Sequence, residues 1–312
     1  MGELKSVFMG TPEISVPFLK KLNSLTDLKL VITQPDRPKG RKRVLTPPPV
    51  KVEAEKLGIE VIQPEKVKKN QKLLETLEKL SPDIILVVAY GKILPETILN
   101  LPKYGCLNVH FSLLPAYRGA APVNWALVNG ETVTGACLMK MDRGLDTGPI
   151  IGCRSVKIEP EDNTEELFAR LTECGLELLE KDLFDYVSGK IKPIPQNEEH
   201  ASYAPIIKKS DGKLDINMDA VDIHNRVRGF YPWPSVYGKV GGKTLKILKT
   251  FLTSMNSDLP PGTVKVISNK PHLVCGDGNL LELITVQPES KKPMDGVSAV
   301  NGGYLKDGDK FE

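Results

Sequence analysis

Three side chains that could support acyl transfer occur in two short segments of this 312-residue chain. Asn108 and His110 lie two positions apart in an apolar run, so their side chains would point to the same face of a β-strand. Asp146 follows in the polar, glycine-containing segment 142–148. An amide and an imidazole can donate hydrogen bonds to a developing oxyanion, and a nearby carboxylate can orient the imidazole or relay a proton. Each residue also has an ordinary structural explanation, such as an Asx turn at Asp146.

The elements around these residues predict an α/β fold. Apolar runs at 6–9, 28–33, 61–62, 83–89 and 107–109 are typical of short strands, and helical patterns occur at 16–25, 49–57, 70–80 and 122–128. Strands that alternate with helices form right-handed crossovers, which indicates a doubly wound, mostly parallel sheet. Such sheets bind ligands beyond the carboxyl ends of their strands. Asn108 and His110 stand at such an end, so we expect the substrate there.

The second half of the chain predicts a different architecture. Strands at 135–141 and 150–158 flank the Asp146 segment, and a helix follows that Asn163 can cap, with Glu166 in capping-box position. The segment 192–205 is polar, contains three prolines and lacks periodicity, which is typical of a linker. Beyond it, a helix at 219–226 and strands at 245–248, 262–267, 272–275 and 280–286 predict a small β-barrel. We therefore expect a catalytic domain at 1–190, a linker at 191–207 and a second domain at 208–312.

Composition excludes several classes of protein. The net charge is only +3, and no run approaches the roughly 20 apolar residues that span a bilayer. The first residues lack a signal-peptide layout, so we expect a cytoplasmic protein without a membrane partner. The five cysteines form no C-x-x-C pair, and the four histidines have no ligand spacing. We expect buried free thiols and no metal site.

Two motifs connect the candidate residues to a known family. Residues 108–122 read Asn-Val-His-Phe-Ser-Leu-Leu-Pro-Ala-Tyr-Arg-Gly-Ala-Ala-Pro, and residues 145–150 read Leu-Asp-Thr-Gly-Pro-Ile. Together they resemble the signature of the folate-dependent formyltransferases, and further similarity lies at 7–13, 33–38 and 231–234. The resemblance implies a Rossmann-like catalytic domain followed by an OB-like barrel.

The resemblance also implies roles for individual residues. Asn108, His110 and Asp146 would be the catalytic trio, and 10-formyltetrahydrofolate would be the formyl donor, a co-substrate used without a metal. Attack of an amine on the formyl carbon creates a tetrahedral oxyanion. Asn108 and His110 would stabilise it, with one such donor worth roughly 3–4 kcal/mol. The residues implied to contact folate are Ser112, Leu113, Leu114 and Pro115, with Val88, Tyr90, Ile93 and Asp142 less closely matched.

A cluster of basic residues follows the second predicted strand. Its members, five of the seven residues at 37–43, are Arg37, Lys39, Arg41, Lys42 and Arg43. Such a run is often a solvated loop, but here it lies at the ligand-binding edge, where it could grip phosphates. The family often has Gly-Arg-Gly where this chain has Gly40-Arg41-Lys42, so the bend of the loop could differ. The resemblance implies that the acceptor is methionyl-initiator tRNA, held by its acceptor stem on a monomeric enzyme.

Three alternative functions remain to be weighed. A formyltransferase acting on a sugar-nucleotide or another small-molecule amine would share the same trio, and the basic cluster favours tRNA over such an acceptor. A dinucleotide-binding dehydrogenase is disfavoured, because Gly10 is not followed by the G-x-G-x-x-G spacing. An RNA-binding module with an inactive catalytic domain would leave the complete trio unexplained.

Overall fold

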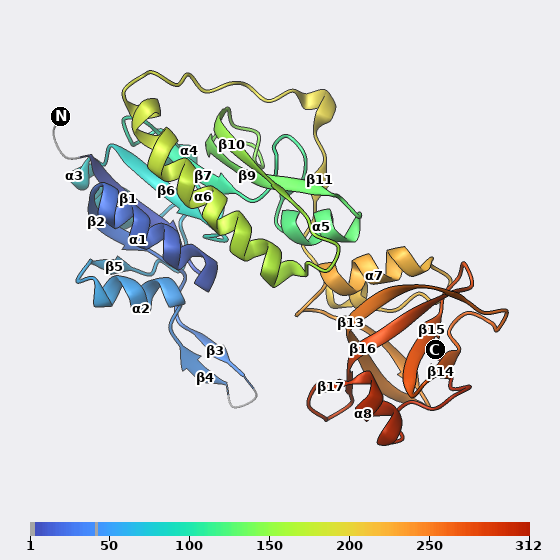
Figure 1. The fold of residues 1–312 in the computed structure, drawn as a ribbon. Coiled ribbons are helices and arrows are strands. Elements are labelled where there is room, and N and C mark those ends of the chain that lie inside the picture. The colour runs from blue at the N-terminus through green and yellow to red at the C-terminus, as the bar shows by residue number, and fades with distance from the viewer. Residues whose placement is uncertain (1–3, 41–42) are drawn as a thin grey trace. The chain divides into compact units, whose positions relative to one another are not determined.

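The computed structural model describes residues 4–40 and 43–312, which form two compact units (Figure 1). Unit 1 comprises the chain up to Gly119 together with Thr134–Val156 and Phe168–Tyr203. Unit 2 comprises Ala120–Val133, Lys157–Leu167 and Ala204–Glu312. The chain therefore passes between the units several times before its last long segment. The domain limits near 190 and 207 remain predictions.

Unit 1 is built on a seven-stranded sheet in the order β10-β9-β7-β6-β1-β2-β5. Its strands are β1 (Lys5–Gly10), β2 (Asp27–Ile32), β5 (Val61–Ile62), β6 (Ile84–Val88), β7 (Cys106–His110), β9 (Val133–Lys140) and β10 (Ile150–Lys157). The five strands β1, β2, β5, β6 and β7 are parallel, and β9 runs antiparallel to β7. The Rossmann-like, mostly parallel sheet is confirmed. Its strand order reverses between β1 and β6, where ligands bind in such folds.

Helices cover both faces of this sheet. They are α1 (Val16–Leu25), α2 (Pro49–Lys56), α3 (Gln71–Leu80), α4 (Glu96–Leu99) and α6 (Thr164–Val187), with 3-10 turns η1 (Glu13–Ser15) and η2 (Glu198–His200). Phe111, just after β7, packs edge-on against Phe18 of α1 and Phe168 of α6, with centroids 5.9 and 5.6 Å apart. On the other face, Leu77 of α3 and Ile98 of α4 share a core with alternate residues of β1 and β6. The period of two in each strand therefore sends successive side chains to opposite layers.

The described residues on the two sides of positions 41–42 form a two-stranded hairpin rather than an irregular loop. Strand β3 (Arg37–Lys39) pairs antiparallel with β4 (Val44–Thr46), and Figure 1 shows the hairpin projecting from the sheet next to α2. At its base, the Asp36 carboxylate accepts hydrogen bonds from Gln63 and Lys51 at 2.7–3.1 Å. These contacts, Gln63 first, lower the pKa of Asp36. They fix where the hairpin leaves the sheet.

Unit 2 contains an antiparallel sheet in the order β12-β13-β16-β15-β14, with β17 paired to β16. Its strands are β12 (Val236–Val240), β13 (Lys243–Asn256), β14 (Val264–Ile267), β15 (Lys270–Val274), β16 (Asn279–Pro288) and β17 (Met294–Asp295). The remaining elements of the chain are α5 (Pro122–Val128), α7 (Ala220–Gly229), α8 (Gly296–Asn301), η3 (Lys209–Gly212), β8 (Arg118–Gly119) and β11 (Tyr203–Ala204).

The last residues of the chain join the two edges of this sheet. Phe311 donates its backbone N–H to the carbonyl of Gly262 beside β14 at 2.9 Å, and Glu312 exchanges two backbone hydrogen bonds with Lys239 of β12 at 2.9 and 3.1 Å. Phe311 and Glu312, called the tail below, therefore connect β12 and β14, the two edge strands of the sheet. Closure removes unpaired edge groups and gives the predicted small barrel.

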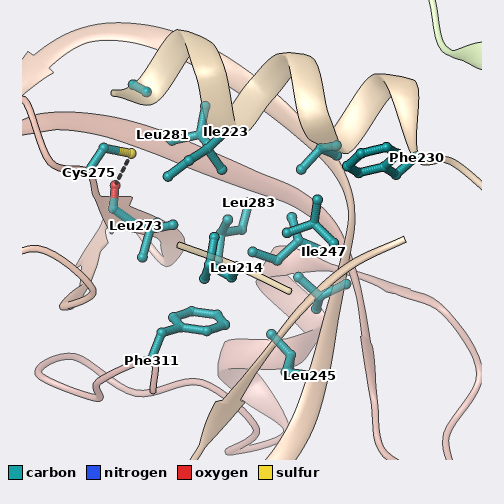
Figure 2. Close-up of a cluster of buried hydrophobic side chains, with 14 of the residues drawn as sticks. Leu214, Ile223, Phe230, Leu245, Ile247, Leu273, Cys275, Leu281, Leu283 and Phe311 are labelled. Carbon is teal, nitrogen blue, oxygen red and sulfur yellow. Dashed lines mark hydrogen bonds between the residues drawn. The ribbon is translucent and has the colours of Figure 1, made fainter. Parts of the chain in front are cut away.

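A single apolar core stabilises unit 2. Figure 2 shows Ile223 and Phe230 of α7 directed at side chains of the sheet, among them Ile247 and Leu283, with Phe311 from the tail below them. All five are at most 3% exposed. The tail therefore contributes to the core as well as to the closing hydrogen bonds.

The expectation of free thiols is wrong for two cysteines. Cys137 of β9 and Cys153 of β10 form a disulfide, with Cα atoms 4.1 Å apart. Their separation along the chain concealed this proximity, which the adjacent placement of β9 and β10 creates. Cys106 and Cys275 are free and buried, and burial raises the pKa of each thiol to about 12. No helix in the described part of the chain combines the length and apolarity needed to cross a bilayer.

His224 is a buried, neutral histidine in unit 2. Its Nδ1 lies 2.9 Å from the Thr250 hydroxyl, and its Nε2 lies 3.4 Å from the carbonyl of Pro160, which can only accept. Burial, and then the charge of Arg228, lower the pKa of His224 below its ordinary value of 6.5. Below that pH the unfolded chain binds a proton that the folded chain resists. This residue therefore makes stability fall as the pH is lowered.

We predict that His224→Gln flattens the acid side of the stability profile. Below the ordinary pKa of 6.5 the wild type should lose stability through this residue, with a slope of at most about 1.4 kcal/mol per pH unit, and the variant should lose correspondingly less. Denaturant unfolding followed by circular dichroism at each pH measures the difference. His200→Gln, at an exposed position, is the control. Parallel profiles for wild type and His224→Gln would contradict the assignment.

Candidate active site

The predicted catalytic residues lie where the parallel strands end. His110 is the last residue of β7, and Asn108 precedes it by two positions on the same face. The neighbouring parallel strand β6 ends at Val88, which is paired in register with Gly10 at the end of β1. The carboxyl edge of the sheet therefore gathers these strand ends, as the sequence predicts.

The structure brings Asp146 to His110. Asp146 Oδ2 lies 3.6 Å from His110 Nδ1, and the imidazole is 5% exposed. His110 Nε2 lies 2.9 Å from the carbonyl oxygen of Tyr117. A carbonyl only accepts, so Nε2 carries a proton, and Nδ1 is the basic atom of the neutral ring. The nitrogen that can take up or release a proton therefore faces the carboxylate.

Asp146 is held from the opposite side by the backbone. Its Oδ2 accepts a hydrogen bond from the N–H of Gly119 at 2.8 Å. Its φ of 54° lies in the left-handed region, which costs a non-glycine residue roughly 1–2 kcal/mol. A backbone in this conformation persists only when its surroundings hold it. The backbone conformation of the Asp146 turn is therefore fixed by the contacts around it, and the turn is more than a simple polar connection.

The loop that follows β7 contains the four residues most closely matched to folate-binding positions. Contacts made by these residues fix the path of the loop. Ser112 is fully buried and donates its hydroxyl to the carbonyl of Ala116 at 2.6 Å. Leu114 is buried in a small apolar cluster with Met139 of β9 and the disulfide-bonded Cys137. Leu113 packs closely over Gly135 of β9, leaving no room there for a larger residue. Pro115 is half-buried. These contacts fix the loop's path, and the folate contacts remain predictions.

The more loosely assigned folate residues differ in accessibility. Tyr90 is 2% exposed, and burial raises the pKa of its phenol to about 12. Its carbonyl accepts hydrogen bonds from the Thr11 hydroxyl at 3.1 Å and the Gln34 amide at 3.0 Å. Ile93, by contrast, is 90% exposed. Tyr90 thus anchors the end of β6, while Ile93 offers an apolar surface.

Two further folate candidates are Val88, the last residue of β6, and Asp142, which follows β9. Val88 is fully buried, and its carbonyl accepts a hydrogen bond from Ser15 at 2.8 Å. Asp142 is exposed and accepts hydrogen bonds from the Gly144 N–H at 3.0 Å and the Thr147 hydroxyl at 2.6 Å. Asp142 therefore folds the loop that carries Asp146. Its predicted role toward folate is not tested by these contacts.

The basic residues of the hairpin that the structure describes are exposed. Arg37, Lys39 and Arg43 are exposed, and Arg37 has one weak ion pair with Glu65 at 3.5 Å. Arg41 and Lys42 lie outside the described residues. Val44 and Leu45 of β4 are 60% and 64% exposed, so apolar side chains accompany the charges. A surface of this kind suits phosphate and base contacts together.

The sequence interpretation missed two side chains, one that reaches the Asp146 loop and one that contacts the first. Gln196, in the segment predicted as a linker, donates to the carbonyls of Asp146 and Gly148, both at 2.8 Å. Arg118, part of the long motif, is fully buried and contacts Gln196. Neither composition nor periodicity signals such contacts, although the position of Arg118 within the motif was a hint. Within residues 4–40 and 43–312, no group of three His, Cys, Asp or Glu side chains is arranged to hold a metal ion.

The comparisons with known proteins agree with this architecture. Residues 5–183 match the Formyl transferase family, and residues 206–303 match the Formyl transferase C-terminal domain. The structure of WlaRD, a sugar 3N-formyl transferase studied with dTDP and 5-N-formyl-THF, is similar in fold, with a TM-score of 0.67 and 18% identity. That similarity covers 94% of this chain and 100% of WlaRD. The chain belongs to the formyl transferases.

Relatives of much higher identity show to which family within the formyl transferases the chain belongs. The methionyl-tRNA formyltransferase of Acidobacterium capsulatum is 44% identical over 97% of this chain and 97% of its own length. That of Caldanaerobacter subterraneus subsp. tengcongensis is 46% identical over 93% of this chain and 94% of its own length. Within the formyl transferases, the chain therefore belongs to the methionyl-tRNA formyltransferase family.

We predict that His110→Ala lowers kcat for formyl transfer about 10²- to 10⁴-fold, the usual contribution of one acid–base residue. The affinity for the folate donor should be largely kept, because the loop contacts of Ser112 and Leu114 do not involve the imidazole. Steady-state kinetics together with calorimetric titration of the folate separate the two effects. His200→Ala, at an exposed position, is the control. Near-normal turnover by His110→Ala would remove this residue from the mechanism.

Proposed function

We propose that the enzyme transfers the formyl group of 10-formyltetrahydrofolate to the α-amino group of methionyl-initiator tRNA, for the initiation of translation. The observation that carries the proposal is the pairing of His110 Nδ1 with the Asp146 carboxylate at the carboxyl edge of the sheet. It occurs in a chain whose family relatives are named for this reaction.

Asn108 is the residue that we assign to the oxyanion. Its carboxamide is half-buried on the same strand face as His110, where it can donate to an oxygen that gains negative charge. A donor fixed in a water-poor site needs no reorganisation when the charge develops. His110 can assist only through a protonated Nδ1, since its Nε2–H is directed at Tyr117.

His110 and Asp146 are assigned to proton transfer. An ordinary α-amine titrates near pH ~8, and esterification of its carboxyl group to tRNA should lower that value, so a useful fraction of the amine is already a free nucleophile near neutral pH. When its nitrogen bonds to the formyl carbon, it must release one proton, and the nitrogen that leaves must gain one. His110 Nδ1 can accept the first proton and supply the second, while Asp146 stabilises the transient imidazolium. The net reaction then needs no covalent enzyme intermediate.

We assign the folate donor to the carboxyl edge of the sheet, between the loop that follows β7 and the loop that carries Asp146. The loop of Ser112, Leu113, Leu114 and Pro115 is rigidly packed, and the exposed Ile93 offers an apolar contact on the neighbouring strand connection. An apolar surface beside polar groups is typical of sites for flat heterocycles. The presence of 5-N-formyl-THF in the study of the similarly folded WlaRD supports a folate at such a fold.

The hairpin of β3 and β4 is assigned to the acceptor stem of the tRNA. Its exposed Arg37, Lys39 and Arg43 can neutralise phosphates, and its exposed Val44 and Leu45 can contact unstacked bases. The neighbouring Arg41 and Lys42 in the sequence extend the same charge. Because charged initiator tRNA is a cytoplasmic substrate, we place the enzyme there, acting as a monomer.

The acceptor is tested by direct competition. With labelled 10-formyltetrahydrofolate, we predict rapid transfer of label to methionyl-initiator tRNA and none to a dTDP-amino sugar. Acid precipitation measures the first product and chromatography the second. Uncharged initiator tRNA is the control, because it lacks the amine. Transfer to the amino sugar alone would establish the alternative acceptor.

The hairpin is tested through salt dependence. Replacing Arg37, Lys39 and Arg43 together by Gln should weaken tRNA binding and reduce the slope of log K against log [salt] by about 2–3, since each phosphate contact contributes roughly 0.7–0.9. A matched control replaces the exposed residues Lys68, Lys72 and Lys79 by Gln, with the same loss of charge. Equal slopes in the two triple variants, or a change in folate affinity alone, would refute the assignment.

A further inference from the structure

The segment 192–205, which connects α6 to the rest of the chain, reaches back to the catalytic loop. The Gln196 side chain donates through Nε2 to the carbonyls of Asp146 and Gly148, both at 2.8 Å. Its Oε1 accepts from Arg118 Nε at 3.0 Å and Nη2 at 2.8 Å. Carbonyls only accept and a guanidinium only donates, so the orientation of the Gln196 amide is unambiguous. Both the nitrogen and the oxygen of this amide are therefore hydrogen-bonded.

Arg118 fixes the other end of this contact. Its side chain is fully buried, and Glu198 pairs with it through two hydrogen bonds of 2.8 Å in the bidentate geometry. The hydrogen bonds that the guanidinium donates to the Glu198 carboxylate raise its pKa. The backbone N–H of Arg118 donates to Ser202 at 2.8 Å. A buried guanidinium is costly unless its donors are satisfied, and Gln196 and Glu198 together accept four hydrogen bonds from it.

These contacts close a ring around Asp146. Gly119, the residue after Arg118, donates its N–H to Asp146 Oδ2, and Gln196 holds the Asp146 carbonyl. The same Oδ2 lies 3.6 Å from His110 Nδ1. The Gly119 N–H thus holds the carboxylate. Gln196 holds the Asp146 backbone in its left-handed conformation, at a φ of 54°.

We infer that Gln196, oriented by Arg118, is a positioning residue for formyl transfer, which keeps the Asp146 carboxylate beside His110. The inference rests on the role proposed above for Asp146. Gln196 touches no reacting atom, so it acts only through the geometry of the Asp146 turn. Without its two hydrogen bonds, the turn can relax from the left-handed conformation, and the carboxylate moves away from the imidazole.

The discriminating variant is Gln196→Glu. It retains an acceptor for Arg118 but replaces the donating amide by an oxygen that repels two carbonyls. We expect kcat to fall about 10- to 100-fold, as a displacement of roughly 1 Å can cause, with KM for folate and tRNA within threefold of the wild type. Asn197→Asp introduces the same chemical change at the adjacent exposed position and should retain wild-type kcat.

A double-mutant cycle separates positioning from general destabilisation. In an Asp146→Asn background, Gln196→Glu should have no further effect on kcat, because the carboxylate it positions is already gone. Gln196→Ala, which adds no charge, is measured in parallel and decides the question if Gln196→Glu unfolds. Gln196 variants with kcat within twofold of the wild type, or an equal loss in both backgrounds, would overturn the inference. A wild-type enzyme without transferase activity would instead overturn the proposed function.

Discussion

The catalytic unit depends on one hydrogen bond, from the N–H of Gly119 to the Asp146 carboxylate at 2.8 Å. It joins the segment that follows β7 to the loop between β9 and β10. Together with the contact of Gln196 to the Asp146 carbonyl, it ties the carboxylate to the segment that carries His110. A backbone donor suits this task because its direction is set by the main chain and does not depend on a side-chain rotamer. The 3.6 Å approach of Asp146 to His110 follows from that restraint.

The sheet supplies the frame for this restraint. β7 lies between parallel β6 and antiparallel β9, so His110 is bordered on one side by the strand that continues into the Asp146 loop. Its register partner on β9 is Cys137, which the disulfide to Cys153 ties to β10. Both strands that flank the Asp146 loop are therefore linked to each other at a point beside His110. A loop anchored at both ends can hold a strained turn that a free loop would lose.

Much of the fold followed from pattern alone. The bounds predicted for α1, β5 and α5 agree with the structure, and the Asn163–Glu166 capping box is present, with hydrogen bonds of 2.9 and 3.1 Å. Local signals suffice for such elements because they depend on neighbours a few residues away. The β3–β4 hairpin was missed because prolines and charges obscure its alternation. Closure of the barrel by Phe311 and Glu312 was missed because it joins positions far apart in sequence.

The sequence by itself determined which residue types are available for the chemistry, and it placed Asn108 and His110 on one strand face. Motif resemblance added Asp146 and the class of reaction. Only the tertiary structure decided that Cys137 meets Cys153, that the Gln196 side chain holds the Asp146 turn, and that Arg118 is buried against Gln196. The physical reason is the same in each case. Hydrogen bonds and disulfides between distant segments depend on distances of a few ångströms, which the packing of whole strands and helices sets and which no local periodicity encodes.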